Sequence, residues 1–183
     1  MPLTSDDSEK ARRFREVALP YLDDIYSLAR YLLRDTSDAE DAVQECYLRA
    51  FRHFDTFRGP DIKPWLLAIL RNVCNAEYAR REHSPVAIDD TPEAASQMSM
   101  WCDVEASPEA ETLRSRDAAT IRTLIETLAE PFKETLVLRE INNLSYREIA
   151  ETVGAPVGTV MSRLARARAM LRTAWMAEEE KPK

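Results

Sequence analysis

Residues 144–164, LSYREIAETVGAPVGTVMSRL, decide the fold of the second half of the chain. Ser145 is followed three residues later by Glu148, and this pair forms a capping box that predicts the start of a helix. Gly154 can adopt the left-handed conformation that ends this helix, and Pro156 is suited to open a second one. A short helix, a tight turn and a second helix are typical of DNA-binding helix-turn-helix units.

The second helix has two different faces. Apolar residues spaced three and four apart predict its buried stripe: Val157, Val160, Leu164, Ala167 and Leu171. The opposite side offers small, hydrogen-bonding and basic side chains: Thr159, Ser162, Arg166 and Ala169, with Arg163 on a flank. A helix that enters the major groove of DNA needs such a face. A solvated face of a bundle is the alternative, although such faces usually include glutamate.

The charge is unevenly distributed along the chain. The formal net charge is −7, which argues against general affinity for nucleic acid. Residues 84–120 contain eight acidic residues and two arginines, whereas residues 152–177 contain four arginines and no acidic residue. This confined basic strip permits a specific DNA contact.

Length and composition predict an all-α protein with two small helical domains. The chain has 183 residues and only three glycines, and its apolar residues follow a helical period. We expect helical domains at residues 10–83 and 113–176. Between them, residues 84–112 form a proline-containing, acidic linker. If fully stretched, this linker would span ~100 Å, at ~3.3–3.6 Å per residue.

Several functional classes lack support in the sequence. No apolar run approaches the ~20 residues of a membrane span, and the N-terminus does not resemble a signal peptide, so we expect a cytoplasmic protein without membrane insertion. Cys46, Cys74 and Cys102 have no metal-ligand spacing and are interpreted as reduced thiols, with a redox or zinc role involving His83 and Cys102 as the less favoured alternative. No cofactor or metal site is expected. His53 and His83 stand outside any catalytic motif, which argues against an enzyme.

The N-terminal half contains an amphipathic helix at residues 38–51, DAEDAVQECYLRAF. Asp38 is a candidate cap, and the predicted buried stripe consists of Ala39, Val43, Cys46 and Ala50. An earlier helix is predicted from the apolar residues Val17, Leu22, Ile25, Leu28, Ala29 and Leu32. The exposed side of residues 38–51 presents Leu48 among acidic residues. This arrangement fits either an isolated surface leucine or a docking face for a basic partner.

A loop and a third helix follow at residues 54–72, FDTFRGPDIKPWLLAILRN. Gly59 and Pro60 mark the loop, and Pro64 fits the first turn of the helix. We expect Trp65, Ile69, Val73 and Ala76 to share one side of this helix, with Asn72 and Asn75 on a flank that a nucleic-acid strand could approach. Most of the aromatic residues are expected in the core.

These segments resemble the sigma factors of bacterial RNA polymerase, in the expected order. Residues 136–172, LVLREINNLSYREIAETVGAPVGTVMSRLARARAMLR, resemble sigma domain four, which implies recognition of the −35 promoter element. Residues 38–51 resemble the polymerase-binding segment of sigma domain two, and residues 54–72 resemble the region that melts the −10 element. The compact plan is similar to the extracytoplasmic-function group. The implied partners are core polymerase, promoter DNA and an anti-sigma factor.

The resemblance implies roles for individual residues. The implied polymerase-binding residues are Asp41, Gln44, Glu45 and Leu48. The implied −10 contacts are Arg58, the loop from Asp61 to Lys63, Arg71 and Asn72. The expected −35 contacts are Arg139, Thr159, Ser162, Arg163, Arg166 and Arg168, of which Thr159 and Arg163 come from the helix face alone. Two alternatives are a sigma-like mimic that titrates an anti-sigma protein and an ordinary helix-turn-helix regulator. The retained arginines argue against the first, and the N-terminal module argues against the second.

Overall fold

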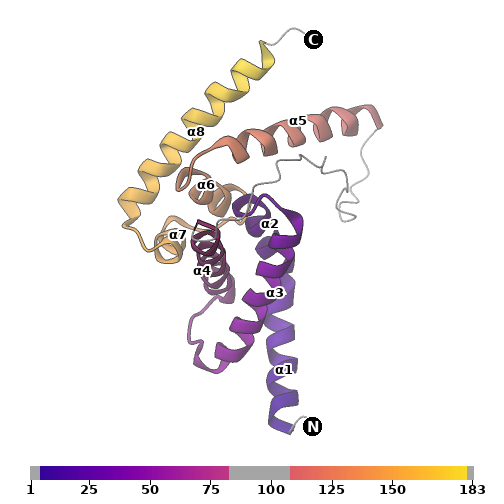
Figure 1. The fold of residues 1–183 in the computed structure, drawn as a ribbon, viewed down its shortest axis with the longest axis vertical. Coiled ribbons are helices and arrows are strands. Elements are labelled where there is room, and N and C mark those ends of the chain that lie inside the picture. The colour runs from indigo at the N-terminus through magenta and orange to yellow at the C-terminus, as the bar shows by residue number, and fades with distance from the viewer. Residues whose placement is uncertain (1–4, 83–107, 181–183) are drawn as a thin grey trace.

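The structure, a computed structural model, describes residues 5–82 and 108–180. All regular elements in these two ranges are helices (Figure 1). The first group comprises α1 (Ser5–Ala18), the 3-10 turn η1 (Leu19–Tyr21), α2 (Leu22–Leu32), α3 (Thr36–His53), the 3-10 turn η2 (Phe54–Thr56) and α4 (Ile62–Glu82). The second comprises α5 (Pro108–Thr127), α6 (Phe132–Glu140), α7 (Tyr146–Val153) and α8 (Val157–Glu179). The prediction of an all-α fold with two helical domains is confirmed.

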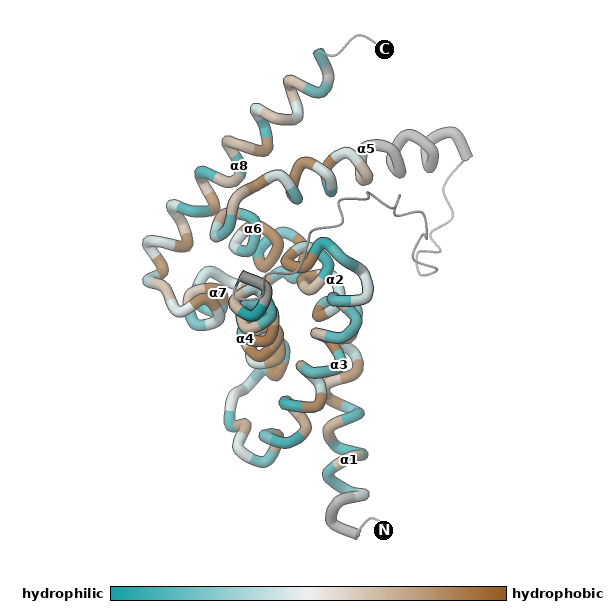
Figure 2. The backbone as a smooth tube through the Cα atoms, viewed as in Figure 1, coloured by the Kyte–Doolittle hydropathy of each residue, from teal (hydrophilic) through white to brown (hydrophobic). Residues whose placement is uncertain are grey.

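The first domain is built around α2, α3 and α4, which pack on one another. Apolar residues on their facing sides, visible as brown stretches in Figure 2, form its core. Helix α1 is joined to this core by Phe14, whose ring makes edge contacts with Tyr47, Phe51 and Phe54 at centroid distances of 5.2–6.2 Å. The Tyr47 hydroxyl donates to the carbonyl of Ala18 at 3.0 Å. This contact fixes the end of α1 where the chain turns.

Some details of the predicted stripes in the first domain are wrong. Val17 and Leu22 are exposed, because the proline-containing turn η1 interrupts the helix and changes the direction of its faces. Asp35, rather than Asp38, caps α3: its carboxylate accepts a hydrogen bond from the amide of Asp38 at 3.0 Å. In α4, Ala76 is exposed, because the buried side runs through other residues, namely Leu66, Leu67, Leu70, Val73 and Cys74.

The helix-turn-helix of the second domain forms as its local sequence predicts. Ser145 caps α7 in a full capping box with Glu148, and Gly154 ends the helix with a φ of 65°. Pro156 stands at the N-cap of α8, whose buried side includes Val160, Leu164 and Ala167. Val157, predicted as part of this stripe, is exposed in the first turn of α8.

The two domains pack against each other. Helix α6 lies on α2, and α7 lies on α4 (Figure 1). The buried side chains of both domains form one continuous cluster. Residues 133–138 of α6 are all buried, because α8 covers one side of this helix and α2 covers another. The second domain therefore lies beside α4, the helix for which a role in promoter melting is predicted.

Candidate functional site

One candidate surface lies on the outer side of α3. Asp41, Gln44, Glu45 and Leu48 follow one another at helical spacing, so they share one face of this helix. Leu48 is 52% exposed, and Glu45 holds Arg49 in an ion pair of 2.5 Å. The face therefore combines an accessible apolar side chain with carboxylates. Such a face can bind a partner by burying the leucine side chain, while its carboxylates attract a basic surface of that partner.

A second candidate surface is the loop before α4. Phe57 stacks on Trp65 with a centroid distance of 5.0 Å, and a Cβ added at Gly59 would lie 2.8 Å from the Phe57 ring. The guanidinium of Arg58 donates to the carbonyls of its own turn. Asp61 accepts a hydrogen bond from the amide of Lys63 at 2.9 Å, which positions the first turn of α4. These contacts give the loop a defined conformation, and two aromatic rings form part of its surface.

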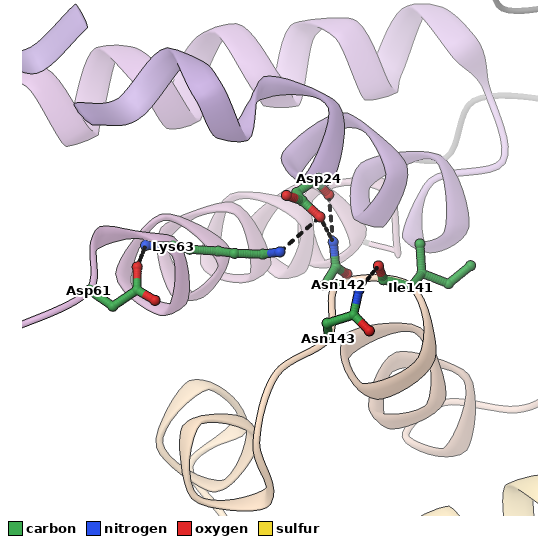
Figure 3. Close-up of polar contacts among 6 residues, drawn as sticks. All are labelled: Asp24, Asp61, Lys63, Ile141, Asn142 and Asn143. Atoms are coloured by element: carbon green, nitrogen blue, oxygen red, sulfur yellow. Dashed lines mark hydrogen bonds and ion pairs between the residues drawn. The ribbon is translucent and has the colours of Figure 1, made fainter. Parts of the chain in front are cut away.

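The predicted −10 residues on α4 do not share one environment. Asn72 is exposed. Arg71 is turned toward the second domain, where its Nε donates to Oε1 of Glu134 at 2.6 Å. Lys63 instead pairs within its own domain: its Nζ lies 2.9 Å from Oδ1 of Asp24 on α2 (Figure 3). Two of the predicted DNA-binding cations are therefore engaged within the protein.

The third candidate surface is the first half of α8. Ser162 and Arg166 are exposed, and Thr159 and Arg163 are half-buried beside them. The Ser162 hydroxyl donates to the carbonyl of Thr159 at 2.9 Å. Because α8 has no acidic residue before Glu178, this face has a local positive charge in an acidic protein. It can approach a phosphate backbone and present arginine to bases.

Two further arginines predicted at this surface have partners inside the protein. Arg139 donates to the carbonyl of Leu144 at 2.8 Å and lies 5.1 Å from the centroid of the Tyr146 ring. Arg168 makes a two-donor contact with Oε1 of Glu140, at 2.6 and 3.1 Å, and its pKa is raised chiefly by this hydrogen bond. Both guanidinium groups are therefore engaged with partners in the second domain.

Burial raises the pKa of several titratable side chains in the described ranges. Burial raises the pKa of Glu134, opposed by the charge of Arg71 and, more weakly, of Arg163, while Glu130 raises it further. Burial also raises the pKa of Cys46 and of Cys74 to about 12, so both thiols are protonated at neutral pH. Cys102 lies outside the described residues. In residues 5–82 and 108–180, no group of three His, Cys, Asp or Glu side chains is placed to hold a metal ion.

Comparisons with known proteins identify the family. The family model described as Sigma-70 region 2 matches residues 18–84, and the one described as Sigma-70, region 4 matches residues 118–171. The RNA polymerase sigma-H factor of Pseudomonas aeruginosa is 35% identical over 161 residues, which cover 86% of this chain and 83% of that protein. The ECF RNA polymerase sigma-E factor of Escherichia coli K12 is 34% identical with the same coverage. The chain belongs to the ECF sigma factors.

Solved structures have the same fold. The sigma factor RpoE of Bartonella quintana, crystallised with the anti-sigma factor NepR, superimposes with a TM-score of 0.72 at 24% identity, covering 90% of this chain and 98% of that one. CnrH, solved with the cytosolic domain of CnrY, gives a TM-score of 0.62 at 22% identity, covering 93% and 91%. As a sigma factor, the protein is a transcription initiation factor and not an enzyme. None of its described helices is long and apolar enough to cross a membrane.

Local sequence patterns do not reveal the residues that join the two domains of this sigma factor. Asp24, Glu134 and Asn142 were not singled out, although Glu134 and Asn142 are among the few buried polar residues in the described ranges. Glu134 stands between the polar residues Lys133 and Thr135, so the local sequence gives no sign that it is buried. Nothing in the local pattern marks Asp24 or Asn142, because their roles depend on a segment more than a hundred residues away.

Proposed function

We propose that this sigma factor directs RNA polymerase to its promoters through three separate surfaces. The face of α3 with Asp41, Gln44, Glu45 and Leu48 binds the core enzyme. The loop and helix with Arg58, Asp61, Lys63, Arg71 and Asn72 capture the opened −10 strand. The helix-turn-helix, through Arg139, Thr159, Ser162, Arg163, Arg166 and Arg168, contacts the −35 element. Residues 10–83 and 113–176 supply these functions, with residues 84–112 as the linker.

One observation supports this division most directly: an acidic face with an exposed leucine and an acid-free basic face lie on different domains. Phosphate repels the first face and attracts the second, so DNA and polymerase would each select one of them. The net charge of −7 keeps the free protein from binding DNA indiscriminately. We place this activity in the cytoplasm, where core polymerase works.

We further propose an anti-sigma factor as the regulator. Support comes from the two structural neighbours, each of which was solved with an inhibitory partner or a partner's cytosolic domain. Co-purification of the chain with a protein that blocks its binding to core polymerase would test this proposal.

Separate variants test the division of labour. Arg166→Ala should weaken binding of the reconstituted holoenzyme to promoter duplex by about 5- to 150-fold, the range of ~1–3 kcal/mol expected for a base-contacting arginine, and leave core binding intact. Arg172→Ala removes another exposed arginine of α8 outside the proposed contacts and is the matched control. The double variant Asp41→Lys and Glu45→Lys should lose core binding. If Arg166→Ala and the double variant were both folded and both lost the same activity, whether core binding or promoter binding, the proposal would be refuted.

A further inference from the structure

A row of exposed apolar side chains runs along the first half of α8, beside the proposed DNA contacts. Val157 is 38% exposed and Met161 is 53% exposed, and Ala165 is exposed as well. Each follows the previous one at a spacing of i, i+4, so the three side chains lie on one ridge of the helix. We call Val157, Met161 and Ala165 the apolar ridge. It is distinct from the buried side of α8, to which Val160 and Leu164 belong.

A polar row lies next to the apolar ridge. Gly158, Ser162 and Arg166 follow its three members in the sequence, so they form a parallel row on the exposed side of α8. A Cβ added at Gly158 would meet nothing within 4 Å, and the side chains of Ser162 and Arg166 are exposed. Because the first turns of this side carry mostly short side chains, the helix axis can come close to a partner. The major groove of B-DNA is ~12 Å wide and admits a helix of this kind.

The charges around both rows favour DNA as the partner. Residues 152–177 contain no acidic residue. Glu140 of α6 reaches α8, but its carboxylate pairs with the guanidinium of Arg168 at 2.6 Å. Phosphates are therefore attracted to the side of α8 that carries the apolar ridge, and their approach would bring base edges within its reach.

We infer that the apolar ridge recognises thymine in the −35 element, through a contact between Met161 and the thymine methyl group. Among the four bases, thymine is the one that presents a methyl group in the major groove. Met161 has an unbranched, adaptable side chain that can pack around this group, and the small Ala165 leaves room for it one turn further along. The inference rests on the proposed contact between α8 and the −35 element, and it names the base that this contact prefers.

The same chemistry disfavours cytosine at this position. Cytosine presents an amino group in the major groove where thymine has its carbonyl oxygen, and it lacks the methyl group. The thioether of Met161 is only a weak acceptor, and the alanine methyl group is not an acceptor at all. An amino group buried against the apolar ridge would lose its hydrogen bond to water without an equivalent replacement. Met161 is therefore a specificity-determining residue, whereas Arg166 can also contribute affinity through phosphate.

Uracil in place of thymine tests the inference, because this change removes only the methyl group. The reconstituted holoenzyme first selects its preferred −35 element from a randomised duplex pool, and each thymine of that element is then replaced by uracil in turn. At one position at least, the wild-type holoenzyme should bind the thymine duplex about fourfold more tightly, equivalent to ~0.8 kcal/mol for one buried carbon. Met161→Ala should abolish this difference, and Met161→Leu, which conserves apolar volume, should keep it.

Met176→Ala is the matched control. Met176 is 56% exposed on the same helix, but it lies roughly 22 Å further along the axis, at ~1.5 Å per residue. Its replacement should leave the preference for thymine over uracil at the wild-type value. Because both methionines are exposed, neither substitution leaves a cavity that could unfold the domain.

Several results would overturn the inference. A selected element without thymine, or equal affinity for thymine and uracil at every position, would show that no methyl group is recognised. A preference that survives Met161→Ala would assign the contact to another residue, and weaker core binding by this variant would make the apolar ridge a polymerase contact. If Arg166→Ala still weakened promoter binding in these cases, the inference alone would fail. If Arg166→Ala had no effect either, the proposed function of α8 would fail with it.

Discussion

Leu48 provides the sharpest test of the polymerase-binding face. Its side chain is 52% exposed on α3, so Leu48→Ala leaves no cavity, and the free energy of unfolding should change by no more than ~0.5 kcal/mol. Complete burial of a leucine contributes ~1.5–3 kcal/mol relative to an exposed one. About half of its surface is already covered, and alanine keeps one carbon, so docking should weaken by ~0.5–1.3 kcal/mol, about 2- to 9-fold in affinity.

The assay is competition for core polymerase between the labelled wild-type chain and each unlabelled variant, at one fixed salt concentration. Leu19→Ala is the matched control, because Leu19 is 45% exposed on the turn before α2, outside the proposed face. It should compete as well as the wild type. Equal competition by Leu48→Ala and the wild type would show that this leucine is an isolated surface residue, and the docking interpretation of α3 would be refuted.

Three further predictions concern stability, pH and reactivity. Ser145→Ala removes the capping box of α7 and should lower the free energy of unfolding by ~0.5–2 kcal/mol in urea titrations; an unchanged midpoint would contradict the assigned cap. The pKa of Glu134 is raised by burial, so the folded protein binds this proton more tightly than the unfolded chain does. Its contribution to the free energy of unfolding should therefore be largest below the ordinary value of 4.5 and fall as pH rises through the raised pKa, and a Glu134→Gln variant with the same pH dependence as the wild type would refute this. Cys46 and Cys74, with pKa values raised to about 12, should resist alkylation at pH 7 in the native protein and react after denaturation, as mass spectrometry can show.

The errors of the sequence analysis have a common physical origin. Val17 and Leu22 were placed in one stripe, but the turn at Pro20 changes the helix direction between them. Val73 and Ala76 were expected to share one side of α4, but the neighbouring helices bury Val73 and leave Ala76 exposed. Periodicity finds a face of a helix, but which face is buried depends on the helices that pack against it.

Local chemistry alone specified the helix-turn-helix. The Ser145 capping box and the left-handed Gly154 act within one or two turns of the chain, so the sequence was enough to predict them. The same applies to the exposed face of α8, where an acid-free run of residues can be seen without any structure.

Tertiary structure alone decided how the two domains meet. Arg71 and Glu134 are 63 positions apart, and Asp24 and Asn142 are 118 positions apart, so no local pattern predicts these pairs. The sequence marked Lys63 and Arg71 as cations for DNA, and the fold turned both toward partners within the protein. The physical reason is that a side chain's type sets what it can bind, whereas the packing of distant helices sets which partner lies within hydrogen-bonding distance.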